Sequence, residues 1–139
     1  MDYKFTSEKV TVADSIEAVN SLFIENGWSD GLPIIPPTQA AVEKMLGGTT
    51  RSPGEILSKI PPAWGEATIE KVAINAVMAG CLPEYLPVII AAVEAMCDEK
   101  FRLGEIQPTT HPIAPLIIVN GPIAQKLNIN SKSGTFEPC

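Results

Sequence analysis

The sequence predicts an α/β fold: a helix-rich single domain with a small sheet around one buried strand and a central helical hairpin. Hydrophobic residues recur at helical spacing in several segments, and two of these, 68–80 and 84–97, are apolar around most of their circumference. Residues 114–121 contain a continuous apolar run of the kind that is buried on both faces of a sheet. A chain of 139 residues without internal repeats fits one domain over residues 1–139.

The charge balance excludes two classes of partner. Sixteen Asp and Glu residues against ten Lys and Arg residues give a formal net charge of -6, so we expect no broad cationic surface for nucleic acid or anionic lipid. No apolar run reaches the roughly 18 to 20 residues that a membrane-spanning helix needs. Residues 1–5 lack the basic and apolar parts of a signal peptide, and the sequence therefore predicts a cytoplasmic location.

The N-terminal quarter is expected to hold one helix between two irregular segments. Residues 1–10 alternate weakly and predict either an edge strand or an arm that lies on a neighbour. The run Asp14–Glu17 is typical of a capping box, and the helix that it begins is expected to end at Asn26–Gly27.

Two further helix starts are predicted before residue 60. Thr38 is a good N-cap for a second helix, which Gly47–Gly48 should end. Ser52–Ile56 has the proline and the glutamate of a third, short helix start. Pro61–Gly65 then interrupts the chain.

The central hairpin follows. Thr68 is expected to cap an apolar helix that ends at Gly80, and Pro83 stands at the start of the next one. Within 88–96 only Glu94 is charged, so this second helix should be buried on most sides. The two helices are expected to run antiparallel, with Cys81 at their corner.

The C-terminal third contains the predicted strand and a short helix over 122–127. One buried strand cannot satisfy its own backbone groups, and the other candidate strands are weak. We therefore expect a homodimer or larger oligomer, in which the strand pairs within or across subunits and the two apolar helices lie near the contact. The segment after residue 127 is a polar tail without a predicted packed element, and we expect this chain to lack C-terminal elements that a longer protein has.

Cys81 and His111 are the candidate catalytic residues. Cys81 precedes a predicted helix start, where the helix N-terminus can lower the pKa of a thiol and favour a nucleophilic thiolate. His111, the single histidine, lies in a proline-stiffened loop and could act as a general base. The alternatives are a small cysteine that fits a tight corner and a solvated loop histidine.

Trp28, Asp30 and Asn120 are the candidate substrate-binding residues. Trp28 could give a small ligand an apolar wall, and Asp30 a hydrogen-bond acceptor. Asn120 follows the predicted strand, at the position where α/β sheets bind ligands. The alternatives are ordinary turns, with Asp30 bonded to its own backbone.

The sequence indicates neither a metal site nor a particular cofactor. Cys81, Cys97 and Cys139 have no CxxC spacing, and a chain with one histidine lacks the usual zinc patterns. No GxGxxG or P-loop spacing is present, so a nucleotide-binding fold is not supported.

Four segments carry a family resemblance: Asn26–Pro33, Gly65–Cys81, Pro83–Tyr85 and Val119–Ile123. They resemble a largely uncharacterised bacterial family, and the likeness extends over roughly residues 20–139. The resemblance implies a second protein subunit that bears a Gly-Ser-Cys motif preceded by cysteine or selenocysteine. It also implies a longer chain, with a Phe-Gly-Pro-Gly-like stretch where this sequence has Phe136–Cys139.

Two functions are consistent with these observations. In the first, the chain is a subunit or fragment of a small-molecule enzyme, with thiol-dependent redox or elimination chemistry. In the second, it is a non-catalytic subunit whose proline-stiffened loops and apolar helices form an assembly interface.

Overall fold

The computed structural model describes residues 4–131. The chain is 42% helical with one small antiparallel sheet packed against helices, which confirms the predicted helix-rich α/β class. It divides into two compact units, Met1–Pro108 and Thr109–Cys139.

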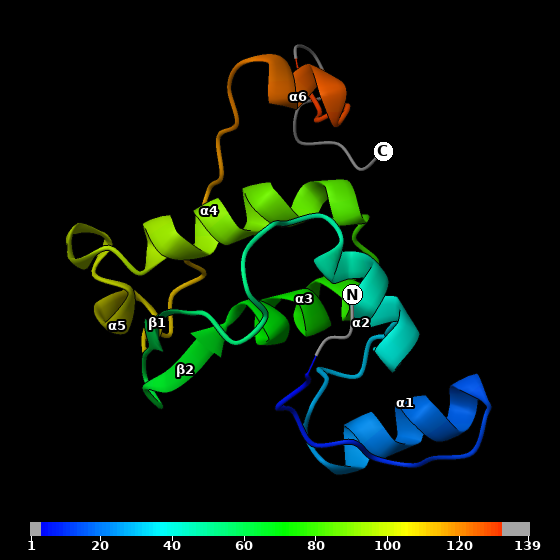
Figure 1. The fold of residues 1–139 in the computed structure, drawn as a ribbon. Coiled ribbons are helices and arrows are strands. Elements are labelled where there is room, and N and C mark those ends of the chain that lie inside the picture. The colour runs from blue at the N-terminus through cyan, green and yellow to red at the C-terminus, as the bar shows by residue number, and fades with distance from the viewer. Residues whose placement is uncertain (1–3, 132–139) are drawn as a thin grey trace. The chain divides into compact units, whose positions relative to one another are not determined.

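The described part of the first unit contains five α-helices, two short 3-10 helices (η1 and η2) and two strands (Figure 1). In chain order these elements are α1 (Ile16–Glu25), α2 (Gln39–Leu46), β1 (Ile56–Ile60), β2 (Gly65–Thr68), α3 (Ile69–Met78), η1 (Pro83–Tyr85), α4 (Leu86–Met96), η2 (Glu99–Phe101) and α5 (Leu103–Ile106). The second unit contains α6 (Pro122–Lys126).

Side-chain caps begin the first three α-helices. Ser15, Thr38 and Thr68 precede α1, α2 and α3, and each side-chain oxygen accepts a hydrogen bond from the backbone N–H three residues later, at 3.1 to 3.3 Å. These bonds satisfy N–H groups that have no partner within the helix. The helix starts predicted at Thr38 and Thr68 are confirmed, and so is a helix start within Asp14–Glu17, although there Ser15 caps the Ala18 N–H instead of forming the predicted capping box with Glu17.

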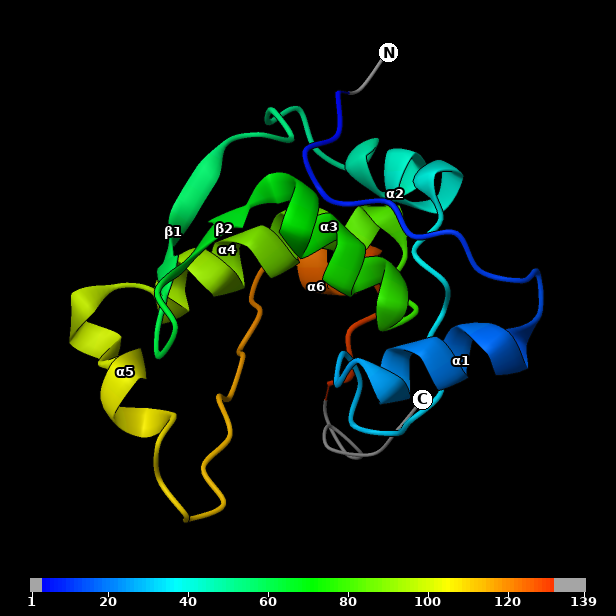
Figure 2. The ribbon, with the colours of Figure 1, turned by 90° about the horizontal axis from the view of Figure 1, so that it is seen from below.

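The core of the first unit is built around α3. This helix packs between α2 and α4, and α3 and α4 lie side by side and antiparallel (Figures 1 and 2), which confirms the central hairpin. The fully enclosed side chains include Leu46, Ile69 and Leu86. The expectation that α4 is buried on most sides is wrong, because only Leu86 and Ile90 of this helix are buried within the described structure.

The corner between α3 and α4 depends on two glycines. Gly80 has a φ of +75°, a left-handed conformation that disfavours any side chain. Gly48, in the loop after α2, lies so close to η1 that an added Cβ would stand 1.9 Å from the carbonyl oxygen of Pro83. The loop after α2 can approach this corner only with a glycine at position 48.

A β-hairpin replaces the predicted third helix start. Ser52 and Glu55 form a turn in which the Glu55 N–H donates to the Ser52 carbonyl at 3.0 Å, and no helix follows. Instead β1 pairs antiparallel with β2, from Ile56 opposite Thr68 to Ile60 opposite Gly65. The hairpin leads directly into α3, and its last residue, Thr68, is also the cap of that helix.

Residues 4–9, called the arm below, have no regular secondary structure and bend at Ser7, so the predicted edge strand is absent. The Phe5 side chain packs against the core, and the Lys9 ammonium donates to the Gln39 side-chain oxygen at 2.7 Å. Thr6 and Ser7 donate to the carboxylate of Glu70 in the first turn of α3. The arm is thus fixed to both α2 and α3, and its course can be followed in Figure 2.

The second unit contradicts the predicted buried strand. Residues 112–120 carry no secondary structure, and Leu116, Ile117 and Ile118 are 56 to 73% exposed. The apolar run has the composition of a strand, but no described segment pairs with it, and a strand forms only with a partner. The helix predicted after it is confirmed as α6, whereas the expected tail beyond residue 131 lies outside the described residues.

Candidate functional site

Cys81 lies at the α3–α4 corner, as predicted, but in a setting that does not activate its thiol. Its backbone N–H donates to the Ala76 carbonyl at 2.9 Å, and its half-buried side chain packs against the core. Burial raises the pKa of the Cys81 thiol, which is opposite to the lowering expected near a helix N-terminus. Cys81 therefore has the character of a packed cysteine.

Trp28 and Asp30 form a local turn. The Trp28 ring stands edge-on to Phe23, with 5.4 Å between ring centroids, and remains 50% exposed. The Asp30 carboxylate accepts a hydrogen bond from the Leu32 N–H at 3.0 Å, which is the backbone-bonded alternative considered for this residue. Asp30 is exposed and retains acceptor capacity for a ligand.

The loop that follows Asp30 does reach the Cys81 corner. The Ile35 N–H donates to the Met78 carbonyl at the end of α3, at 3.1 Å. An added Cβ on Gly80 would lie 3.9 Å from the Ile35 side chain. The Asn20 side chain also accepts from the Ile34 N–H at 3.2 Å, so α1 and α3 both fix this loop.

His111 and Asn120 belong to the second unit, whereas Trp28, Asp30 and Cys81 belong to the first. His111 is exposed, and its Nδ1 lies 3.2 Å from the Thr109 hydroxyl oxygen two residues earlier. Asn120 is exposed just before α6. Within its own unit, neither residue is part of a described cluster of titratable side chains.

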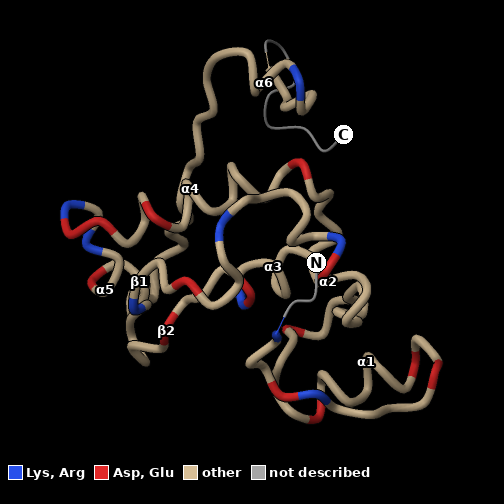
Figure 3. Tube along the Cα trace, viewed as in Figure 1, with Lys and Arg blue, Asp and Glu red and all other residues tan. Residues whose placement is uncertain are grey.

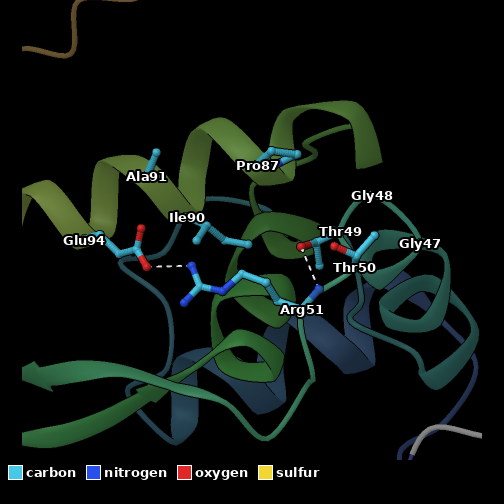
Figure 4. Close-up of a pocket in the computed structure, with 9 residues that line it drawn as sticks. All are labelled: Gly47, Gly48, Thr49, Thr50, Arg51, Pro87, Ile90, Ala91 and Glu94. Atoms are coloured by element: carbon cyan, nitrogen blue, oxygen red, sulfur yellow. Dashed lines mark hydrogen bonds and ion pairs between the residues drawn. The ribbon is translucent and has the colours of Figure 1, made fainter.

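An open cavity of about 420 Å³ lies between α4 and the loop after α2 (Figure 4). This volume is in the range of small-molecule sites. The loop contributes two hydroxyls and Arg51, and α4 contributes an apolar wall and Glu94. The lining residues are Gly47, Gly48, Thr49, Thr50, Arg51, Pro87, Ile90, Ala91 and Glu94.

The charge in this cavity is already paired. The Arg51 guanidinium forms ion pairs with Glu55 at 2.7 Å and with Glu94 at 2.5 Å, and its backbone N–H donates to the Thr49 hydroxyl. Its hydrogen bonds to Glu55 and then Glu94 raise the pKa of Arg51, and the bond to Arg51 lowers the pKa of Glu55. The cavity therefore offers an anionic ligand no unpaired cation among its lining residues.

Glu70 is a site residue that sequence reasoning missed. It is fully buried, although glutamate is almost never so unless it is paired. The backbone N–H groups of Thr6 and Ser7 and the Thr6 hydroxyl donate to its carboxylate at 2.8 to 3.2 Å. A glutamate in the first turn of a helix is commonly found there because it pairs favourably with the helix dipole, so no sequence signal indicates this contact.

The other feature with functional potential is an uncharged, largely apolar stretch of the chain. Residues 106–125 contain no Lys, Arg, Asp or Glu, and the tube between α5 and α6 in Figure 3 is uncharged throughout. Within it Ile113, Leu116, Ile117 and Ile118 are each more than half exposed. Isolated exposed aliphatic residues are common, whereas these four lie within six positions of one stretch.

None of the helices between residues 4 and 131 has the length and the apolar character that crossing a lipid bilayer requires.

Comparison with known proteins adds no relative. No family model, curated protein or solved structure matches this chain.

Proposed function

We propose that this chain is an assembly subunit that pairs with a second copy of itself through residues 113–119, called the apolar segment below. One observation carries the proposal: four large aliphatic side chains are exposed along an extended stretch of backbone. From Ala114 to Asn120 no backbone N–H or carbonyl forms a hydrogen bond with a described residue. Such a stretch is a template for strand pairing.

A second copy fits the segment because the same chain carries unpaired sheet edges. The sheet has only two strands, so β1 and β2 each have one edge without a strand partner in the described structure. A contact in which the segment of each copy adds to the sheet edge of the other would be reciprocal, as in a two-fold symmetric dimer. It would satisfy backbone groups on both sides.

The charge distribution also supports pairing of identical chains. Two copies that each carry a net charge of -6 repel one another. Since residues 106–125 contain no ionisable Asp, Glu, Lys or Arg side chain, a contact there brings no like charges into direct proximity. A dimer of this kind should bury on the order of 2,000 Å².

Light scattering on the purified chain tests the proposal. At micromolar concentration we expect a particle of about twice the 14.8 kDa chain mass. Leu116→Lys should convert it to a monomer, because the substitution places a charge in the contact. The matched control is Leu32→Lys: Leu32 is 68% exposed and Leu116 69%, so both are surface leucines outside helices and strands. A monomeric wild type, or the same response in both variants, would overturn the proposal.

An enzymatic function is the second candidate. The observation that favours it is the hydrogen bond from Ile35 to Met78, which joins the loop after Trp28 and Asp30 to the corner that bears Cys81. A small molecule that bound to both the turn and the corner would have an aromatic ring, a carboxylate and a thiol as partners. Because the thiol has a raised pKa, the redox-active residue would have to come from the partner protein with the Gly-Ser-Cys motif that the family resemblance implies.

A further inference from the structure

We propose that Glu70 and the surfaces beside it form a peptide-binding site, whose resident ligand is the chain's own arm. The site recognises a segment without regular secondary structure in which an aromatic residue is followed by a hydroxyl-bearing residue and a free backbone N–H. This inference is separate from the assembly contact, since the arm, Gln39 and Glu70 belong neither to residues 113–119 nor to β1 or β2.

Three separate contacts hold the arm. The Glu70 carboxylate accepts hydrogen bonds from the N–H groups of Thr6 at 3.0 Å and Ser7 at 2.8 Å, and from the Thr6 hydroxyl at 3.1 Å. Phe5 packs against the hydrophobic core, and Lys9 reaches Gln39 on α2. The two consecutive N–H groups that donate to the Glu70 carboxylate define the direction in which the segment binds. The contacts of the Phe5 ring and the Thr6 hydroxyl define which side chains the segment must carry.

The arm supplies the hydrogen bonds that the buried carboxylate needs. Glu70 is fully buried, and no described Lys or Arg forms an ion pair with it. A carboxylate enclosed in this way is strongly unfavourable without donors, and the donors of the arm satisfy it in the structure. Departure of the arm would replace these hydrogen bonds with hydrogen bonds to water, so the arm is retained by its complementary donors and by the packing of Phe5.

Backbone contacts outside the arm fix the helical turn that carries Glu70. The Glu70 N–H donates to the Pro53 carbonyl at 2.9 Å, and the Ile69 N–H donates to the Glu55 carbonyl at 3.0 Å. The Thr68 side chain caps the same helical turn. None of these bonds uses an arm residue, so we expect the backbone of the site to be preformed for an incoming segment.

The connection between the arm and the rest of the chain allows the binding site to be tested directly. Residues 10–15 are exposed, and their backbone carries no regular secondary structure. A protease recognition sequence inserted between Val12 and Ala13 can therefore be cut after the full chain has folded. Residues 1–12 are then no longer covalently linked to the core, and the contacts of the arm must hold them.

We expect the cut arm to co-elute with the remaining chain in gel filtration, and a labelled synthetic peptide of residues 1–12 to exchange into the complex. Glu70→Gln should release the arm at least about tenfold faster, because an amide is a weaker acceptor and no longer charged. Glu66→Gln is the matched control, since Glu66 is exposed on β2 and its side chain has no hydrogen bond in the described structure. It should retain the arm as the wild type does.

Thr6→Val provides a second measurement if Glu70→Gln fails to fold, because it changes only the arm and removes only the hydroxyl donor. It should release the arm several-fold faster from an unaltered core. Loss of the cut arm from the wild type, or equal retention by the Glu70→Gln, Thr6→Val and wild-type chains, would overturn the proposal. Repeating the assay with Leu116→Lys separates it from assembly, because arm retention in a monomer does not depend on the apolar segment.

Discussion

Cys81 shows how a residue's packing can reverse the chemistry that its position in the sequence suggests. A cysteine just before a helix start can be activated by the helix dipole, yet the element that follows begins as a 3-10 turn at Pro83. The Cys81 N–H donates a hydrogen bond to the Ala76 carbonyl near the end of α3. Desolvation raises the pKa of the Cys81 thiol. The small, partly buried side chain is suited to the tight corner beside Gly80.

The first prediction concerns this thiol. Alkylation of Cys81 by iodoacetamide at pH 8 should be at least about threefold slower than that of an unstructured thiol, because a raised pKa reduces the thiolate that reacts. Mass spectrometry of the peptide that contains Cys81 gives its rate separately from those of Cys97 and Cys139. The same peptide in denaturant is the control and should react at the unstructured rate. A native rate above the denatured one would restore Cys81 as a candidate nucleophile.

Glu70 illustrates what sequence cannot indicate at the residue scale. Its carboxylate is bonded to residues 63 and 64 positions earlier in the chain. Sequence alone does not distinguish it from Glu66, which lies four residues earlier on β2 and is exposed. By contrast, the Asp30 turn and the three helix caps depend on groups within three residues, and these could be predicted.

At the scale of elements, hydrophobic periodicity identified helices more reliably than strands. The α3–α4 hairpin was predictable for two reasons. A helix forms its backbone hydrogen bonds within itself, and both helices have apolar residues around more of their circumference than a surface helix has. The β-hairpin was missed because the capping residues at Ser52–Glu55 form a turn instead. Leu116–Val119 was predicted as a strand on composition, but strand formation requires a partner that composition does not specify.

The second prediction tests the helical hairpin as the core. Val77→Asp should lower the free energy of unfolding by more than roughly 3 kcal/mol, because Val77 is only 6% exposed and an unpaired charge there has no compensating contact. Urea denaturation followed by circular dichroism measures the change. Val10→Asp is the control: Val10 is 50% exposed, and its substitution should alter stability by less than about 0.5 kcal/mol. Equal effects of the two substitutions would show that α3 is not the centre of the core.

At the scale of the whole molecule, the chain combines one well-buried core with surfaces that this core does not cover. The first unit buries a single cluster around α3, whereas α1 buries no residue and α4 buries two. The helix-rich class could be predicted from the number of apolar helical segments. The division into two units could not, because composition does not show that the apolar run has no strand partner among residues 4–131.

The third prediction is a pH dependence of stability. Hydrogen bonds from Ser7 and Thr6 lower the pKa of Glu70 below its ordinary value of 4.5, against the opposing effect of burial. The resulting stabilisation is present above about pH 4.5 and is lost as the pH falls through the lower folded-state pKa. The unfolding free energy of the wild type should therefore exceed that of Glu70→Gln by about 2 kcal/mol at pH 6, and by less below pH 4. Denaturation at several pH values measures this difference, and one that grows on acidification would contradict it.

The two attachments of the N-terminal region also bear on how the chain can change in length over evolution. Residues 10–33 lie between the arm, fixed at Glu70, and the loop fixed by the bond from Ile35 to Met78. They form a closed loop that contains α1, a helix with no buried residue. Doubling such a loop costs only about 0.6 kcal/mol of closure entropy, so insertions and deletions here leave the core nearly unaffected. Divergent copies of this chain are expected to differ in length first between these two attachments.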